Sequence, residues 1–575
     1  ADQAANTLTV KVNGATSATL NGVTVSNLVV SSGGAVTADV VAQVDAGSAD
    51  FSLTVTDSQA ITVKATLLVI VAPQVCGGGN SAVWSQQSQN LASDGAAGDH
   101  LGVSVAISGN TAIVGANLND AAGNDAGAAY IFTRSGTTWT QQQKLIPPAG
   151  ECLTSINFGS SVAISGDTAI VGAIKANTSL VDAAGAAYVF TRSGSVWSLQ
   201  QKLTAADPQT NVSFGTSVAI SGDTVLVGAT RTGGTVAGDV YVFTRNGSTW
   251  AQQQKLNNQF SVNFGTSVAI NGDTAIIGAS LETLLANRQG AAHIFTRNGT
   301  TWSEQAALYA SDAAANDNYG SSVAISGDTV VVGALLADLA AGSNAGKVYV
   351  YTVSGSSWTE QQKLTASDAA AGANFGKSSA LSGDTAMIGS ANGAYVFTRS
   401  GANWTQQQKL TPQSGATGIN FGGAVAFSGN TFIVGASLDD PAAGADAGSS
   451  YIFTVDCPNT APSITAQTGL ARQQGSPVSN SIIATVSDAE SAAGSLTVTV
   501  TSANPSSGVT ISNIVNTNGT ITADIVASCA ASNASFTLQV SDGSLTATAT
   551  LNVTVTAATP PTSSKPRTPQ KKARA

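Results

Sequence analysis

Carboxylate and amide side chains gather in several loops that are otherwise rich in Gly and Ala. The candidate metal ligands are Asp120, Asn124, Asp125, Asp439, Asp440 and Asp446, and a further group contains Asp312, Asn316 and Asp317. Several oxygen ligands within one short loop suit Ca²⁺, so calcium is a possible ligand, although the sequence requires no cofactor. Asp and Asn are also common turn formers, because their side chains accept hydrogen bonds from nearby backbone amides. Both interpretations stay open.

Residue types that serve as catalytic bases and nucleophiles are scarce. The chain has two histidines, His100 in a loop and His293 in an apolar segment where the related segments carry tyrosine. No serine lies in a GxSxG turn, and carboxylates in variable loops define no catalytic pair. We therefore expect packed or exposed imidazoles, and a protein that is not an enzyme.

The composition argues against two classes of partner. Only 10% of the 575 residues are charged and the net charge is -10. An acidic chain of this kind is a poor match for nucleic acid, and no apolar run approaches the length that membrane insertion needs. The first residue is Ala1, which suits a processed secreted protein or a segment of a longer one. We expect an extracellular or cell-surface protein.

The elements that position the loops form a tandem repeat. Seven tryptophans spaced by 46 to 58 residues each open a segment similar to WxQQQKL: Trp84, Trp139, Trp197, Trp250, Trp302, Trp358 and Trp404. The sequence between them divides into short predicted strands, for example Phe158–Ser165, Thr168–Ala173, Ala186–Thr191 and Trp197–Leu203. The SGDT joining the first two suits a tight hairpin. Four antiparallel strands per unit predict a propeller blade.

The two ends of the repeat region complete each other. The first tryptophan strand, residues 84–91, precedes every FG segment, whereas the last repeat reaches Thr454 without a tryptophan strand after it. Six whole blades and one assembled from both ends predict a seven-bladed ring that residues 84–91 close.

The repeat resembles the FG-GAP repeat of integrin-α-type propellers. Its motifs are FG pairs such as Phe158-Gly159, each followed by a GA pair such as Gly172-Ala173, and the departures are Leu101-Gly102, Tyr319-Gly320 and Ser390. The resemblance implies a β-propeller, a role in adhesion, and calcium held by DxDxDG loops. The SGDT hairpins are too short for that motif, so a calcium site would fall to the acidic groups in the other loops.

The predicted all-β chain has four parts. Residues 1–75 form a partial Ig-like β-sandwich without its opening strands, 76–457 the seven-bladed propeller, 458–556 a complete Ig-like β-sandwich, and 557–575 a basic, Pro-rich tail. The two sandwiches share sequence, such as VTVSNLVV from Val23 and VTISNIVN from Val509. Only the second has the residues for extra strands at its start.

The predicted ring closure should bring two cysteines close together. Thr454 and Trp84 should be neighbours in the closing blade, so a disulfide between Cys76 and Cys457 is a candidate lock for the ring. Free thiols, or a pair formed by Cys457 and Cys529, are the alternatives.

Two functions fit these features. The first is a non-enzymatic structural or adhesion protein of the cell surface or extracellular space, with Ig-like spacers and a propeller whose long, variable loops bind a protein or glycan ligand. The alternative is a self-assembling extracellular fibre subunit, in which a strand from a neighbouring copy completes the N-terminal sandwich. A third hypothesis makes the chain a fragment of a longer adhesin.

Overall fold

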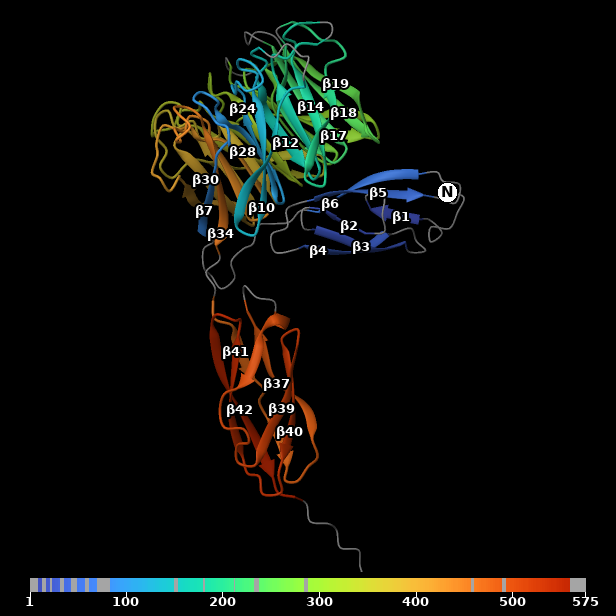
Figure 1. Ribbon diagram of the computed structural model, residues 1–575, viewed down its shortest axis with the longest axis vertical. Coiled ribbons are helices and arrows are strands. Elements are labelled where there is room, and N and C mark those ends of the chain that lie inside the picture. The colour runs from blue at the N-terminus through green and yellow to red at the C-terminus, as the bar shows by residue number, and fades with distance from the viewer. Residues whose placement is uncertain are drawn as a thin grey trace, which may run out of the picture. The chain divides into compact units, whose positions relative to one another are not determined.

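Nearly all regular structure in the chain is β-strand (Figure 1). The computed structural model describes residues 9–12, 17–20, 23–30, 36–42, 49–56, 62–69, 83–148, 154–178, 181–210, 212–231, 237–283, 288–456, 460–488 and 493–558. Over these ranges the one helical element is the 3-10 helix η2 (Ala493–Ser495). The strands up to residue 456 and those from residue 463 belong to two separate compact units.

Each repeat folds into a four-stranded antiparallel sheet, called a blade, whose strands are lettered A to D outward from A. Blade 1 is β8 (Leu101–Ser108), β9 (Thr111–Ala116), β10 (Ala128–Ser135) and β11 (Thr138–Leu145); blade 2 is β12 (Phe158–Ser165), β13 (Thr168–Ala173), β14 (Ala186–Ser193) and β15 (Val196–Leu203). Blade 3 is β16 (Val212–Ser221), β17 (Thr224–Arg231), β18 (Ala237–Asn246) and β19 (Thr249–Val262); blade 4 is β20 (Phe264–Asn271), β21 (Thr274–Ala279), β22 (Ala291–Asn298) and β23 (Thr301–Leu308). Blade 5 is β24 (Tyr319–Ser326), β25 (Thr329–Ala334), β26 (Lys347–Ser354) and β27 (Ser357–Leu364); blade 6 is β28 (Ser378–Ser382), β29 (Thr385–Ser390), β30 (Gly393–Ser400) and β31 (Asn403–Leu410).

Blade 7 takes its fourth strand from the start of the repeat region. Its strands are β32 (Phe421–Ser428), β33 (Thr431–Ala436), β34 (Ser449–Asp456) and β7 (Val83–Asn90). Strand β7 pairs antiparallel with β34, with Trp84 opposite Val455 and Gln89 opposite Tyr451. The A strands contact one another in sequence order, and β32 contacts β8, so seven blades form a closed ring. This is the closure that the sequence predicts.

The hairpins follow from their turn residues. In blade 2, Ser165 pairs with Thr168 across the dipeptide Gly166-Asp167, and Gly166 has a φ of 55°, which a glycine adopts without strain. The predicted bounds of β12 and β13 agree with the structure. Strands β14 and β15 run further, because pairing continues past Arg192 and Trp197 to Ser193 and Val196.

The FG and GA glycines are needed where neighbouring blades meet. A Cβ on Gly159, whose φ is +93°, would lie 2.3 Å from the carbonyl oxygen of Ala128, and one on Gly115 would lie 2.1 Å from the carbonyl oxygen of Gly159. Gly435 and Gly102 repeat this contact between blades 7 and 1. The blades touch backbone to backbone near the ring axis, so both motif positions exclude a side chain.

Each repeat tryptophan is tied to the preceding blade. In blade 2, the Trp197 amide donates to Gln143 Oε1 at 2.8 Å, Gln143 Nε2 donates to the Trp197 carbonyl at 2.7 Å, and Trp197 Nε1 donates to Gln142 Oε1 at 3.1 Å. The paired amide and carbonyl bonds, hereafter the Gln latch, recur between Gln201 and Trp250, Gln254 and Trp302, Gln362 and Trp404, and Gln408 and Trp84. The tryptophan spacing thus records a contact between blades.

The N-terminal strands form two three-stranded sheets. One has the order β1 (Thr9–Val12), β5 (Ala49–Thr56), β6 (Thr62–Val69), and the other has the order β2 (Ala18–Leu20), β3 (Val23–Val30), β4 (Val36–Ala42). Strands β1 and β3 contact each other across the two sheets, and Val12 and Val25 are fully buried.

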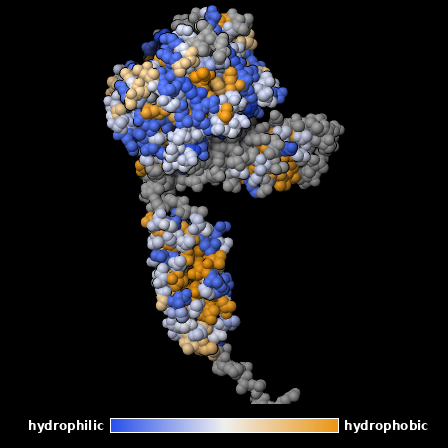
Figure 2. Space-filling model, in the orientation of Figure 1, coloured by the Kyte–Doolittle hydropathy of each residue, from blue (hydrophilic) through white to orange (hydrophobic). Residues whose placement is uncertain are grey.

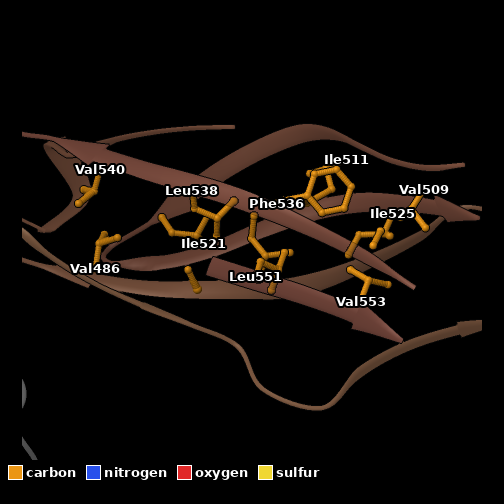
Figure 3. Packing of buried hydrophobic residues seen from close by; sticks show 14 of the residues in the cluster. Val486, Val509, Ile511, Ile521, Ile525, Phe536, Leu538, Val540, Leu551 and Val553 are labelled. Carbon is orange, nitrogen blue, oxygen red and sulfur yellow. The ribbon is translucent and has the colours of Figure 1, made fainter. Parts of the chain in front are cut away.

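The C-terminal unit contains two four-stranded sheets. One has the order β35 (Ser463–Ala466), β37 (Ser479–Ser487), β40 (Thr520–Ala527), β39 (Val509–Thr517), and the other has the order β36 (Leu470–Gln473), β42 (Thr546–Thr556), β41 (Ala534–Ser541), β38 (Thr497–Val500). Residues of both sheets, among them Ile521, Ile525, Phe536 and Leu551, share one hydrophobic core (Figure 3). The unit is therefore a two-sheet β-sandwich.

Several sequence predictions fall outside the described residues. These are the proposed disulfide between Cys76 and Cys457 and the tail from residue 559. Cys529 is described as a free, exposed thiol, so the alternative bond between Cys457 and Cys529 is not formed.

Candidate functional site: the loop face of the propeller

The antiparallel order of the strands separates two faces of the ring. The A–B and C–D hairpins lie at one end of every blade, and the B–C and D–A loops lie at the other. Val83 and Asp456, where the chain enters and leaves the ring, pair with each other at the hairpin end. The B–C loop spans residues 117–127 in blade 1 but only 391–392 in blade 6. Long loops of unequal length on a repeated scaffold make the loop face the candidate binding site.

The first predicted metal group organises its own loop. Asp120 Oδ1 accepts a hydrogen bond from the Asp125 amide at 2.8 Å, and Asn124 Nδ2 donates to Asp125 Oδ2 at 3.2 Å. Asp125 has a φ of 49°, which Asp tolerates better than most residues. The three side chains are thus brought together, and they shape the turn.

The same loop geometry recurs in other blades. Asp440 Oδ1 accepts from the Asp446 amide at 2.7 Å, and Asp338 Oδ1 accepts from the Asn344 amide at 2.8 Å. Asp446 and Asn344 both have a φ of 53°. The acidic clustering in these loops is therefore explained by a shared turn, in which one carboxylate caps the amide of a residue in the left-handed conformation.

Asp439 has a different role from its neighbours. It is buried, and its Oδ2 accepts hydrogen bonds from Tyr451 Oη at 2.8 Å, Gln89 Nε2 at 2.9 Å and the Ser449 hydroxyl. Burial and the hydrogen bond to Asp439 raise the pKa of Tyr451 to about 12. Asp439 therefore joins the loop to the β34 and β7 pair that closes the ring.

The described residues contain no group of three or more His, Cys, Asp or Glu side chains placed to hold a metal ion. In the third group, Asp317 Oδ2 accepts from the Ala314 amide at 2.9 Å, and Asp312 pairs with Lys347 at 3.1 Å and with Lys363 at 3.0 Å. Calcium binding remains a prediction. Carboxylate oxygens of Asp120, Asp125, Asp439 and Asp440 already accept hydrogen bonds within the protein.

Beneath the loops, a Tyr–Asp–Lys network recurs from blade to blade. In blade 3, Tyr241 Oη donates to Asp207 Oδ1 at 2.8 Å, Lys255 Nζ donates to Asp207 Oδ2 at 2.7 Å, and Lys255 Nζ lies 5.3 Å from the centre of the Tyr241 ring. Equivalent sets are Tyr130, Asp94 and Lys144; Tyr349, Asp312 and Lys363; and Tyr395, Asp368 and Lys409. Each set fixes the loop that precedes a blade to strands C and D of that blade.

The hydrogen bonds of this network favour an ionised aspartate and a neutral tyrosine. Burial opposes the ionised form of Asp207, but hydrogen bonds from Lys255 and Tyr241 outweigh it and hold the pKa of Asp207 below its usual range. Burial and the bond to Asp207 raise the pKa of Tyr241. The carboxylate is thus ionised and the phenol neutral across the physiological range, which favours a structural ion pair over proton transfer.

Blade 4 replaces this network with a buried histidine. His293 takes the place of the tyrosine and Ala307 the place of the lysine, and His293 Nδ1 lies 2.8 Å from Glu304 Oε1 while Nε2 lies 3.0 Å from Glu282 Oε2. Burial lowers the pKa of His293, but its bonds to Glu282 and Glu304 outweigh burial and raise the pKa to about 9. The imidazolium therefore supplies the positive charge that lysine supplies elsewhere. Its ring is fully buried, as a packed imidazole should be.

The hairpin face carries arginines that are also engaged. Arg192 Nε donates to Asp167 Oδ1 at 2.7 Å, its Nη1 donates to Thr111 Oγ1 of blade 1 at 2.9 Å, and its guanidinium lies 5.3 Å from the Trp197 ring centre. Arg134, Arg245, Arg297 and Arg399 repeat the bond to a threonine of the preceding blade. Val353 and Val455 stand at this position in blades 5 and 7. These charges join blades together.

The sequence interpretation missed both charge networks. Their signal was present, because tyrosine in strand C, lysine in strand D and Asp at the start of the preceding loop recur at fixed offsets. In the Tyr–Asp–Lys network the partners lie at least 27 residues apart in the chain, as Tyr395 does from Asp368, and Lys144 lies 50 residues from Asp94, so only the ring geometry brings them together.

The comparison with known protein families agrees with the repeat. The family described as FG-GAP repeat matches residues 84–132, 139–190, 197–243, 250–295, 302–351, 358–402 and 404–453, which is more than half of the chain. No curated protein matches the chain. Among solved structures, the chain is similar to a candidate 6-phosphogluconolactonase from Bacteroides uniformis, with 11% identity, a TM-score of 0.38, and coverage of 63% of this chain and 92% of that one.

Proposed function

Because the chain belongs to the FG-GAP repeat family, we propose that it is a non-enzymatic extracellular or cell-surface structural and adhesion protein. FG-GAP repeats are typical of extracellular proteins that mediate adhesion or bind ligands. In the described part of the chain, no helix is long and apolar enough to cross a membrane. The flanking units act as Ig-like spacers, and the propeller presents its loop face to a protein or glycan ligand.

The observation that carries this proposal is the contrast between the two faces. Hairpins such as Gly166-Asp167 are short and repeat from blade to blade, and the arginines beside them already bond to Asp and Thr. The B–C loops differ in length by several residues and carry exposed carboxylates and amides. The propeller surface in view in Figure 2 is mainly hydrophilic, with scattered hydrophobic residues, as expected for recognition of a polar ligand.

Loop grafting tests the proposal. The B–C loop of blade 5, residues 335–346, is replaced by the two-residue turn Ala391-Asn392 of blade 6, and binding to arrayed glycans and extracellular matrix proteins is measured. We expect binding by the unaltered chain to be lost or weakened at least tenfold in one or more loop grafts. The control is a swap of Gly247-Ser248 in a C–D hairpin for Gly299-Thr300, which should leave binding unchanged. Binding that survives shortening of every long B–C loop would contradict the proposal.

Calcium is tested separately. If Asp120 and Asp125, or Asp440 and Asp446, bind calcium, millimolar Ca²⁺ raises the melting temperature and chelator lowers it, because a ligand that binds only the folded state stabilises it. Asp120→Asn should remove part of that shift while keeping an oxygen for the Asp125 amide. A melting temperature that neither calcium nor chelator moves would refute the calcium prediction and leave the adhesion proposal intact.

A second candidate function is favoured by one observation. The two N-terminal sheets have six described strands, against eight in the sheets of the C-terminal unit. A subunit that exposes an unfilled sheet edge can assemble into fibres by strand addition. Filaments seen by electron microscopy, and lost when residues 1–75 are deleted, would support this function; a monomeric sedimentation profile at all concentrations would exclude it.

A further inference from the structure

Two of the seven junctions between the described blades have no Gln latch. The latch residue stands four positions after the tryptophan of its own strand, and at these two junctions it is Ala306, before blade 5, and Ser88, before blade 1. Alanine has no polar side-chain atom, and Ser88 Oγ donates to Asn90 Oδ1 at 3.2 Å. Among the described residues, Trp358 and Trp139 are therefore the tryptophans without a bonded carboxamide.

The exposure of the tryptophans follows the latch. The five tryptophans that a glutamine holds are 2–4% exposed, Trp139 is 8% exposed, and Trp358 is half-buried. Ala306 is also half-buried, so the shortened side chain leaves both residues open to solvent. Loss of the latch glutamine uncovers its tryptophan, and the effect is largest where alanine replaces it.

Strand pairing directs the backbone groups of Trp358 to the outer edge of blade 5. Val353, which lies opposite Trp358, donates its amide to the carbonyl of Asp328 in the hairpin before β25. Both backbone groups of an extended residue point to the same side, so Val353 and Trp358 do not bond to each other, and the Trp358 N–H and C=O point away from β26. Trp197 has the same arrangement in blade 2, where its outward groups bond to Gln143.

The indole of Trp358 keeps its usual partner, whereas its backbone does not. Trp358 Nε1 donates to Gln305 Oε1 at 3.2 Å, as the other repeat tryptophans do to the equivalent glutamine. In the described part of the chain, no side chain bonds to the Trp358 amide or carbonyl. Gln305 and Ala307, on either side of Ala306, are exposed. A backbone donor and a backbone acceptor thus lie side by side at a place that solvent reaches.

This pair of backbone groups selects one ligand chemistry. The N–H requires an acceptor and the C=O requires a donor, and a primary carboxamide carries both on one planar group. A carboxylate has no hydrogen for the carbonyl, and an ammonium or guanidinium group has no acceptor for the N–H. The trans secondary amide of a peptide bond or of an acetylated sugar directs its N–H and C=O to opposite sides. The five latches show that a glutamine side chain fits.

We propose that the outer edge of blade 5 at Trp358 is a binding site for a primary carboxamide, supplied by a glutamine side chain of a partner polypeptide. The carboxamide oxygen accepts from the Trp358 N–H, its NH₂ group donates to the Trp358 carbonyl, and its methylene groups lie beside Ala306. The site is next to the C–D hairpin, where Ser354 pairs with Ser357, at the opposite end of the blade from the loop face. It therefore goes beyond the function proposed for that face.

The test uses the full chain labelled with ¹⁵N at tryptophan, and propionamide as a probe that matches the glutamine side chain. We expect the backbone amide signal of Trp358, identified by its loss in Trp358→Phe, to shift saturably at about 10–100 mM propionamide, as for a ligand of so few atoms. The signals of the five latched tryptophans should stay fixed. Propionate and N,N-dimethylpropionamide should cause no such shift, because neither can donate to the Trp358 carbonyl.

Matched variants move the site within the chain. Ala306→Gln should abolish the response, because its own carboxamide bonds to the same two groups of Trp358. Ala307→Gln, at the exposed neighbouring position, is the control and should keep the response. In the reverse direction, Gln254→Ala should make the signal of Trp302 respond to propionamide, because its latch is removed.

A peptide distinguishes the polypeptide partner from a small amide. A five-residue peptide of glycine and serine with a central glutamine should shift the Trp358 signal at least threefold more tightly than the same peptide with glutamate.

Each outcome decides a stated part of the proposal. No saturable shift, an equal shift with propionate or N,N-dimethylpropionamide, or a shift that persists in Ala306→Gln would overturn the site. A response of Trp139 together with Trp358 supports it, since both lack a latch. Equal binding of the glutamine and glutamate peptides would overturn the assignment of a glutamine partner.

Discussion

The Gln latch should be worth a measurable part of the stability of each contact between blades. In Gln254→Ala the two bonds of 2.8 Å that join the Gln254 side chain to the amide and carbonyl of Trp302 are removed. One natural contact already lacks the latch, because Ala306 stands at the position of the latch glutamine that would bond to Trp358. Trp302 is 2% exposed, whereas Trp358 is only half-buried.

The magnitude follows from the two bonds. Each contributes about 0.5–1.5 kcal/mol net, and water can reach part of the site after truncation, so we expect Gln254→Ala to lower the free energy of unfolding by about 1–2 kcal/mol. Ala306→Gln should raise it by less, about 0.5–1 kcal/mol, because a glutamine must be immobilised to form the same bonds.

Tryptophan fluorescence is the appropriate assay. All seven tryptophans lie between residues 84 and 404, so the signal reports unfolding of the propeller and not of the flanking units. Denaturant midpoints of Gln254→Ala, Ala306→Gln and the unaltered chain are compared at constant slope. Gln253→Ala, which removes only the 3.2 Å bond to Trp302 Nε1, should cost about half as much. If Gln254→Ala leaves the midpoint unchanged, the latch is an accessory to packing rather than a source of stability.

Three further changes test other contacts. His293→Gln should remove a pH dependence of the stability. The pKa of His293 is about 9 in the folded chain against 6.5 unfolded, so the charged form adds about 3 kcal/mol below pH 6.5, and this contribution is lost as pH rises through 9. Melting temperatures of the unaltered chain and the variant should therefore converge toward pH 10. Gly159→Ala should destabilise the propeller by at least about 3 kcal/mol, since the φ of Gly159 is +93° and the new Cβ would lie 2.3 Å from the Ala128 carbonyl oxygen. The control is Gly136→Ala, in a turn where φ is +60° and the added Cβ would meet open space. In thermal unfolding this control should lower the stability by about 1 kcal/mol. Arg245→Met should lower the free energy of unfolding by about 1–2 kcal/mol, because its bonds to Asp223 and Thr168 are lost. The double variant with Thr168→Val should lose no more stability than the sum of the two single changes. If salt abolishes the loss in Arg245→Met, only the surface charge matters.

The repeat architecture could be predicted because it rests on local rules. SGDT turns, alternating apolar strands and the spacing of Trp84 to Trp404 specify blades before any long-range contact is considered. Closure by residues 84–91 follows from counting strands, and the FG-GAP family match agrees with the same repeat. The assignment of the flanking strands to Ig-like domains remains a prediction. Their shared strand order was already visible as sequence similarity.

The candidate site was less accessible to sequence reasoning. Asp120, Asp440 and Asp446 are as consistent with a calcium loop as with a turn when only residue types are known, and the structure supplies the hydrogen bonds that make the turn. The sequence predicted only that His293 is a packed or exposed imidazole, because Glu282 and Glu304 show no local pattern around it.

The sequence by itself determined the blades, their number and the face on which the variable loops lie, since turns and strand alternation act within a few residues. Only the tertiary structure decided which glycines touch across blades, which glutamine holds which tryptophan, and that Trp358 is half-buried where Trp302 is buried. These are contacts between segments far apart in the chain. Their energies depend on distance and burial, which residue order alone does not specify.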